Sequence, residues 1–278
     1  MKRSATFDGS LYDYLKTSSD VEALSLADAD EASALLSAIH DWFEWFLEDV
    51  EDLHPATALL TFNAVIMFNA AVKLALSGQA HAVYAVLRGA LEAACYAQAM
   101  ADDPVAIEAW SSRERSPADK AVCRRVMSTA VRSTAAKLNA RQAGTGSCVS
   151  ELYEAAIDWG AHPNVRSVMG NTIIGDDSSD LQARLIAIHG PNGLATVRAK
   201  NACIDLGVTL AIIISYYKQR RKPGYQEAIN DLIQARESLF SSLLEAYPPE
   251  SRPRVRSHLI ASSNAFRHRL ATGRDGIG

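Results

Sequence analysis

The stretch that decides the fold, residues 79–103, reads QAHAVYAVLRGALEAACYAQAMADD. At 100° per residue it separates into two faces. One face holds small apolar residues that let a neighbouring helix approach closely: Val83, Val86, Ala90, Ala94 and Ala97. The other gathers polar and aromatic side chains within about a third of the circumference: His81, Tyr84, Arg88, Glu92, Cys95 and Tyr96. The pattern predicts a single amphipathic helix around which the other helices pack.

Arg88 and Glu92 stand four residues apart on this helix, and three interpretations stay open. An exposed pair at this spacing contributes only about 0.2–0.5 kcal/mol. The Arg precedes the Glu, which is the less favourable order, and aromatic residues at Tyr84 and Tyr96 indicate partial burial. A buried pair is costly to desolvate and therefore serves either the fold or a ligand.

Composition favours a mainly α fold. The chain has 278 residues, of which 48% are apolar and 22% charged, as in soluble globular proteins. Gly and Pro are few, and sustained alternation of polar and apolar residues is rare. We therefore expect a multi-helix bundle of about eight helices with one small β-hairpin insertion.

Helical spacing and Gly or Pro punctuation place the elements along the chain. A loose N-terminal lead-in is expected over 1–20, a helical bundle domain over 21–246, and a basic C-terminal helix and tail over 247–278. Within the bundle the hairpin is expected near 168–188. Helices are expected at about 28–52, 55–77, 79–103, 104–112, 117–140, 148–160, 194–219 and 225–246.

Charge is unevenly distributed along the chain, although the net charge is only −4. Residues 1–54 hold 13 acidic and 3 basic residues, whereas residues 218–278 hold 11 basic and 6 acidic. Attraction between the two ends, within one chain or between two copies, is the simplest explanation, and we expect a homodimer. A nucleic-acid surface is the sharper alternative, but the acidic net charge opposes it.

Cysteine usage and hydropathy favour a cytoplasmic protein without a membrane segment. Cys95, Cys123, Cys148 and Cys203 show no paired spacing and are interpreted as reduced thiols. The longest apolar run recognised, Leu206–Tyr217, is too short to span a bilayer. No metal site is predicted, because Glu51 and His54 form the only Glu-x-x-His pair and stand at a helix end. No cofactor is predicted.

Several motifs carry a resemblance over residues 55–217. Ser77-Gly78-Gln79 is followed by residues 87–92 (LRGALE), then by Asp103-Pro104 and Trp110. Leu152-Tyr153 and residues 161–164 (AHPN) come later, before a hairpin pattern and a long apolar helix. The segment resembles bacterial helical proteins of unknown function that are similar to the HEPN superfamily, which includes toxin and defence ribonucleases.

The resemblance implies a helical bundle and, as one candidate activity, metal-independent RNA cleavage. The superfamily's catalytic signature is Arg, four to six residues, then His. In this chain Arg184 with His189, and Arg252 with His258, have that spacing.

The resemblance further implies a cluster of five residues: Arg88, Glu92, Tyr153, His162 and Asn164. Arg88 and His162 are the candidate catalytic residues within it. The structural alternatives are that His162, which precedes Pro163, caps a helix end, and that Asp205 is the buried partner of Arg88.

Three functions remain open, and whether the protein is an enzyme is not decided. The preferred one is an interaction or ligand-binding protein, because a guanidinium suits the carboxylate or phosphate of an anionic small molecule. The second is a ribonuclease in which Arg and His stabilise and protonate the scissile phosphate. The third is a nucleic-acid binder using the C-terminal tail or the basic side of the helix at 117–140: Lys120, Arg124, Arg125, Arg132 and Lys137.

Overall fold

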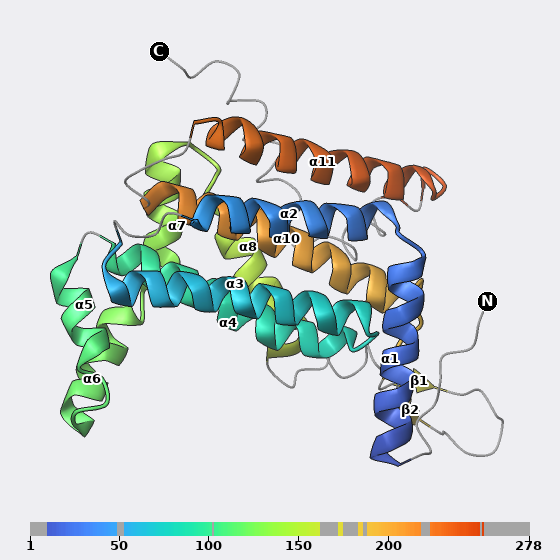
Figure 1. Ribbon diagram of the computed structural model, residues 1–278, viewed down its shortest axis with the longest axis horizontal. Coiled ribbons are helices and arrows are strands. Elements are labelled where there is room, and N and C mark those ends of the chain that lie inside the picture. The colour runs from blue at the N-terminus through green and yellow to red at the C-terminus, as the bar shows by residue number, and fades with distance from the viewer. Residues whose placement is uncertain are drawn as a thin grey trace.

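The computed structural model describes residues 10–48, 53–101, 103–161, 172–174, 183–185, 188–217, 223–250 and 252. The mainly α fold predicted from the sequence is confirmed (Figure 1). The elements are α1 (Leu11–Ala27), α2 (Glu31–Leu47), α3 (Pro55–Leu76), α4 (Ala80–Met100), α5 (Pro104–Ser111), α6 (Pro117–Met127), α7 (Ala130–Arg141), α8 (Ser147–Ala156), the π-helix η1 (Ile157–Ala161), β1 (Thr172–Ile174), β2 (Ala183–Leu185), α10 (Leu194–Tyr217) and α11 (Tyr225–Glu245).

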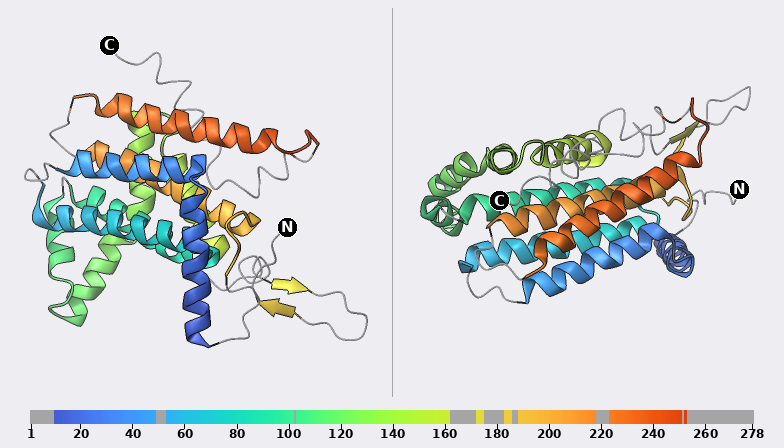
Figure 2. Two further views of the ribbon diagram at one scale, coloured as in Figure 1. Left: turned by 45° about the vertical axis from the view of Figure 1, so that its right-hand side comes forward. Right: turned by 90° about the horizontal axis from the view of Figure 1, so that it is seen from above.

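The central element is α10, which packs against α2, α3, α4 and α11 (Figures 1 and 2). Its second half is apolar on every side, and Leu206, Leu210 and Ile213 are fully buried. Gly207 lets the helices approach closely, because a Cβ there would lie 2.5 Å from Ile39 Cγ2 and 2.9 Å from Phe68 Cε2. The apolar run noted in the sequence, Leu206–Tyr217, is thus a largely buried part of α10.

The helical hairpin of α3 and α4 forms the layer that carries the candidate site. Pro55 starts α3, and Gly78, at φ +77°, turns the chain into α4. Val83, Ala90, Ala94 and Ala97 on the small-residue face of α4 are fully buried, so that prediction is confirmed. Tyr84 and Cys95 are buried as well, which shows that part of the opposite face also lies inside the bundle.

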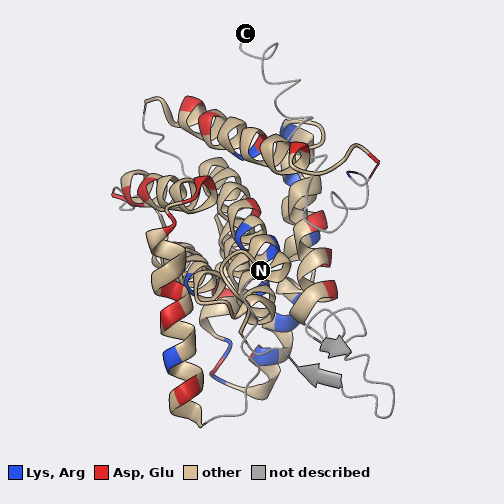
Figure 3. Cartoon of the chain, turned by 90° about the vertical axis from the view of Figure 1, so that its right-hand side faces the viewer, with Lys and Arg blue, Asp and Glu red and all other residues tan. Residues whose placement is uncertain are grey.

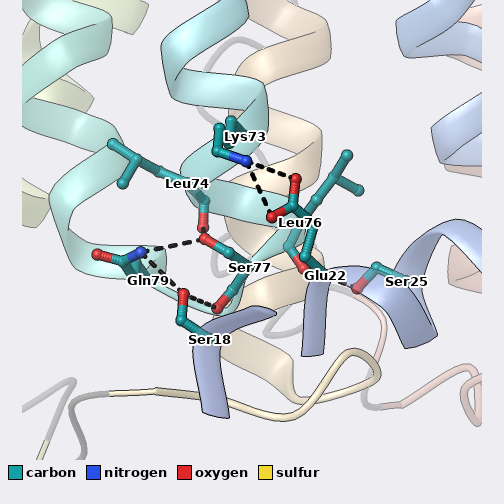
Figure 4. A network of polar contacts seen from close by, with 8 residues as sticks. All are labelled: Ser18, Glu22, Ser25, Lys73, Leu74, Leu76, Ser77 and Gln79. Carbon is teal, nitrogen blue, oxygen red and sulfur yellow. Dashed lines mark hydrogen bonds and ion pairs between the residues drawn. The ribbon is translucent and has the colours of Figure 1, made fainter. Parts of the chain in front are cut away.

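Residues 11–27 form the helix α1. The expectation of a loose lead-in over 1–20 is therefore wrong for residues 11–20. The buried positions of α1 include Ser18 and Ser25, while Leu11, Tyr12 and Leu15 are exposed. Ser25 donates to the Leu76 carbonyl at 2.8 Å, and Ser18 to the Ser77 carbonyl at 3.4 Å (Figure 4). These are carbonyls at the C-terminal end of α3, which lack partners within their own helix. Because these contacts are polar, they produce no apolar periodicity in the sequence from which α1 could be predicted.

Other boundaries also differ from the prediction. The helix expected over 117–140 is two helices, α6 and α7, separated at Ser128 and Thr129. The expected hairpin is not supported as an element that extends over 168–188. The strands described there, β1 and β2, have three residues each, and they pair antiparallel with Thr172 opposite Leu185. The rest of that segment, except Ile188, and residues 253–278, which belong to the expected basic C-terminal helix and tail, lie outside the described residues.

The expectation concerning apolar segments needs one correction. α3 is long and apolar enough to cross a membrane, with a mean hydropathy of 1.7 over its best window, of which 39% is buried in the bundle. It packs against α4 and α10. The absence of a membrane segment and the cytoplasmic location therefore stay predictions.

Acidic positions recur along α1, α2 and α11 (Figure 3). Nine of the eleven basic residues expected to attract them lie in 218–222 and 253–278, outside the described part of the chain. The attraction between the chain ends and the homodimer therefore stay predictions.

Candidate functional site

The structure brings three of the five predicted residues together: Arg88, Glu92 and Tyr153, which we name the Arg88 cluster. Arg88 Nε donates to Glu92 Oε1 at 2.9 Å, and Arg88 Nη2 donates to Tyr153 Oη at 3.1 Å. The Tyr153 hydroxyl in turn donates to Glu92 Oε1 at 3.1 Å. One carboxylate oxygen therefore accepts from both the guanidinium and the phenol, which closes a three-membered ring of hydrogen bonds.

The Arg88 cluster is only partly buried. The side chains of Arg88 and Glu92 are 27% and 31% exposed. The Arg88 guanidinium carbon lies 5.3 Å from the centroid of the Tyr153 ring, a cation–π contact that orients it. The cluster is thus an ordered polar group with access to water.

Electrostatics keep Tyr153 neutral and Arg88 charged at neutral pH. Burial and the Glu92 carboxylate raise the pKa of Tyr153, so its hydroxyl stays protonated and available as a donor. Burial opposes the charge of Arg88, but Glu92 and Tyr153 outweigh it and raise the Arg88 pKa. A permanent cation therefore lies beside one carboxylate and one neutral phenol.

Tyr153 is positioned by α8 and by the π-helix that follows it. Trp159 in η1 packs near Tyr84 of α4, with ring centroids 6.5 Å apart. Gly160 permits this contact, because a Cβ there would lie 2.6 Å from the His81 carbonyl oxygen and 2.9 Å from Tyr84 Cβ. A π-helix is rare and is often found at functional sites.

Asp205 is not the partner of Arg88, contrary to the structural alternative considered from the sequence. Its Oδ1 accepts from Arg236 Nε of α11 at 2.8 Å, and the two side chains are 2% and 4% exposed. Arg236 also donates to Glu237 at 2.5 Å. The buried pair of the bundle is therefore Arg236–Asp205, and the Arg88 pair is a different, more exposed one.

A second polar group on α10 was only partly visible in the sequence. The guanidinium carbon of Arg198 lies 4.0 Å from the centroid of the Trp159 ring, a cation–π contact. Spacing in the sequence could not predict a contact between residues this far apart. Within the described part of the chain, Tyr84 Oη, Asn201 Nδ2 and Asp205 Oδ2 are buried and have no hydrogen-bond partner. Asp205 is buried whereas Arg198 and Asn201 are half-buried, so these polar residues of α10 lie at the edge of the bundle interior.

Two predicted site residues, His162 and Asn164, lie outside the described residues, so their place in the cluster stays a prediction. Of the Arg–His pairs with HEPN-like spacing, His258 also lies outside them. His189 is buried, and its backbone N–H donates to the Gly78 carbonyl at 2.9 Å. Burial, with His81 and Arg198 nearby, lowers the pKa of His189 and keeps it neutral at pH 7.

The described residues hold no group of three or more His, Cys, Asp or Glu side chains arranged for a metal ion. The four cysteines are buried free thiols. Burial raises the pKa of Cys95 to about 12, so it remains a protonated core residue.

Comparison with known proteins does not assign the chain to a family. No protein-family model, no curated protein and no solved structure matches it. The resemblance to the HEPN superfamily therefore stays a prediction, and the site must be interpreted from its own geometry.

Proposed function

We propose that this is a helical ligand-binding protein in which the Arg88 cluster accepts the anionic group of a small molecule. The observation that supports the proposal is the partly exposed Arg88 side chain, whose guanidinium is held between Glu92 Oε1 and Tyr153 Oη. A planar guanidinium with fixed orientation matches the geometry of carboxylate and phosphate groups.

The ion pair is weak enough to exchange one acceptor for another. An i,i+4 pair with this exposure contributes only about 0.2–0.5 kcal/mol. An incoming phosphate or carboxylate can therefore replace Glu92 as the acceptor at a small cost in free energy.

Tyr153 distinguishes this Arg from ordinary surface arginines. Its ring contacts the Arg88 guanidinium, and its hydroxyl is hydrogen-bonded to both charged partners. These contacts reduce the side-chain entropy that binding would otherwise remove from a long, mobile Arg. A ligand thus meets a preorganised donor.

A thermal-shift screen tests the proposal with phosphate, sulfate, acetate and citrate as probes. We expect at least one anion to raise the melting temperature of the wild-type protein, and Arg88→Gln to abolish that shift. The matched control is Arg115→Gln, because Arg115 pairs with Glu108 at 3.0 Å but both side chains are 67% exposed. The control should respond to the anion as the wild type does.

Two results would contradict the proposal. One is an equal shift in the wild type and Arg88→Gln, which would place the anion elsewhere. The other is cleavage of labelled RNA by the wild type that is lost in Arg88→Gln, which would replace ligand binding by catalysis.

A further inference from the structure

The segment from residue 120 to residue 150 contains six Lys or Arg residues and no Asp or Glu. It covers most of α6, all of α7 and the start of α8. Five of its cations lie on α6 and α7, and we refer to them together as the basic surface: Lys120, Arg124, Arg125, Arg132 and Lys137. The sixth, Arg141, donates instead to the Tyr216 carbonyl at 2.7 Å and so ties α7 to α10.

The cations of the basic surface are available to a partner. Arg124, Arg125, Arg132 and Lys137 are exposed and Lys120 is half-buried. Within the described part of the chain, none of the five side chains forms a hydrogen bond or an ion pair. By contrast, Arg113 and Arg115, just before α6, pair with Glu114 and Glu108.

The basic surface has features that do not serve helix stability. Arg132 stands in the first turn of α7, where the positive end of the helix dipole disfavours a cation. Lys120 and Arg124 are like charges at i,i+4, a spacing that costs a few tenths of a kcal/mol. Only Arg124 and Arg125, in the last turn of α6, are placed where the dipole favours them.

The surroundings favour a polyanion over a folded protein as the partner. Protein interfaces have an apolar, often aromatic centre. Between residues 117 and 141, Val122 is the one large hydrophobic side chain described as exposed, at 39%. A polar, cationic surface built from a segment, 120–150, that contains no Asp or Glu is the kind that binds nucleic-acid phosphates. The α5–α6 pair also projects from one end of the bundle, away from α1 (Figure 1).

We propose that the basic surface of α6 and α7 binds the phosphate backbone of a nucleic acid, at a site separate from the Arg88 cluster. No aromatic residue occurs between 120 and 150, so the surface offers no platform for stacking bases. Binding should therefore depend on phosphate charge and not on base sequence.

Fluorescence anisotropy with the full chain tests this proposal. The probes are a labelled 20-nucleotide single-stranded RNA and a 20-base-pair DNA duplex, titrated at 50, 100 and 200 mM NaCl. If all five cations contact duplex phosphates, log K should fall with log salt concentration with a slope of about −4.5; a single strand should give about −3.5. The arm with the higher affinity identifies the form of nucleic acid.

The decisive variant is Arg124→Gln/Arg125→Gln/Arg132→Gln, compared with the control Arg113→Gln/Arg115→Gln. The triple variant should weaken binding about tenfold or more and reduce the duplex slope to about −2. The control should bind as the wild type does, and circular dichroism should show native helix content for both.

Absence of binding to both nucleic acids at 50 mM NaCl would overturn the proposal. So would an unchanged slope in the triple variant. A titration with polyglutamate separates the competing partner: salt-dependent binding of polyglutamate without binding of either nucleic acid would assign the surface to an acidic protein segment.

Discussion

Two Arg–carboxylate pairs of the molecule, Arg236–Asp205 and Arg88–Glu92, differ mainly in burial. Arg236 and Asp205 are 4% and 2% exposed, and their atoms lie 2.8 Å apart between α10 and α11. Arg88 and Glu92 are 27% and 31% exposed, lie 2.9 Å apart, and belong to one helix. The chemistry is the same, but the cost of removing or replacing a partner differs.

Burial decides which pair is fixed and which can exchange its partner. In the interior, loss of one partner leaves the other charge buried where water cannot reach it. The free-energy cost of separating the two charges therefore keeps the pair together. Near the surface, water and solutes compete with the carboxylate, and the pair contributes little. We infer that Arg236–Asp205 fixes the packing of α11 on α10, whereas the Arg88–Glu92 pair can exchange its acceptor, as the proposed ligand binding requires.

The largest expected effect is that of Arg236→Ala. The substitution leaves Asp205 buried without its partner and should lower the free energy of unfolding by about 3–5 kcal/mol. Chemical denaturation followed by circular dichroism measures this loss. The matched double variant Arg236→Met/Asp205→Leu removes both charges and should recover most of it; a loss equal to that of Arg236→Ala would show that shape, and not charge, dominates.

An intermediate effect is expected at Lys200, whose side chain is 3% exposed while its partner Asp30 is 35% exposed, with the two atoms 2.8 Å apart. Lys200→Met should cost about 1–2 kcal/mol at neutral pH. Burial acts to raise the Asp30 pKa, but hydrogen bonds from Lys200 and Ser33 outweigh it and lower the pKa.

The lowered Asp30 pKa determines how the destabilisation by Lys200→Met changes with pH. A lowered folded-state pKa stabilises the fold above the ordinary carboxyl pKa of about 4, and the contribution is lost as the pH falls through the folded value. The difference between wild type and Lys200→Met should therefore shrink in acid. A difference that grows as the pH falls would contradict this account.

A smaller effect of opposite sign is expected at Glu151. Burial and the nearby Asp205 raise its pKa, and Arg236 offsets them only in part. Ionised Glu151 therefore opposes folding above its raised pKa, and this cost disappears once the pH is below the ordinary Glu value of about 4.3. Glu151→Gln should stabilise the protein by about 0.5 kcal/mol at pH 7, since Glu151 is half-exposed, and by nothing at pH 4. Thermal melts at the two pH values measure this.

The smallest effect on stability is expected at the candidate site itself. Arg88→Gln should change the free energy of unfolding by only about 0.2–0.5 kcal/mol, because the pair it breaks is partly hydrated. Urea titration measures the change. A loss of several kcal/mol would place Arg88 with Arg236 as a structural residue and would remove the contrast between the two pairs.

The sequence predicted those parts of the fold that depend on local signals. Pro55, Gly78 and Pro104 mark the starts of α3, α4 and α5 within a few residues, because Pro fixes its own φ and Gly permits the positive φ of the turn. The helix α1 was missed, since Ser18 and Ser25 make its contacts and an apolar stripe does not.

Pairing between distant helices was beyond local signals. Whether Asp205 meets Arg88 or Arg236 depends on how α10 rotates within the bundle, which is a tertiary property. Arg88 and Glu92 share a helix, so their contact followed from spacing. The approach of Tyr153 came from a resemblance, because 65 residues separate it from Arg88.

The central claim is that an anion can replace Glu92 as the acceptor of the Arg88 guanidinium. Isothermal titration of inorganic phosphate into Glu92→Gln, compared with wild type and Arg88→Gln, tests it most directly. We predict tighter phosphate binding by Glu92→Gln than by wild type, and none by Arg88→Gln, because the competing carboxylate is removed in one and the donor in the other. Phosphate binding that is unchanged or weakened in Glu92→Gln would contradict the claim.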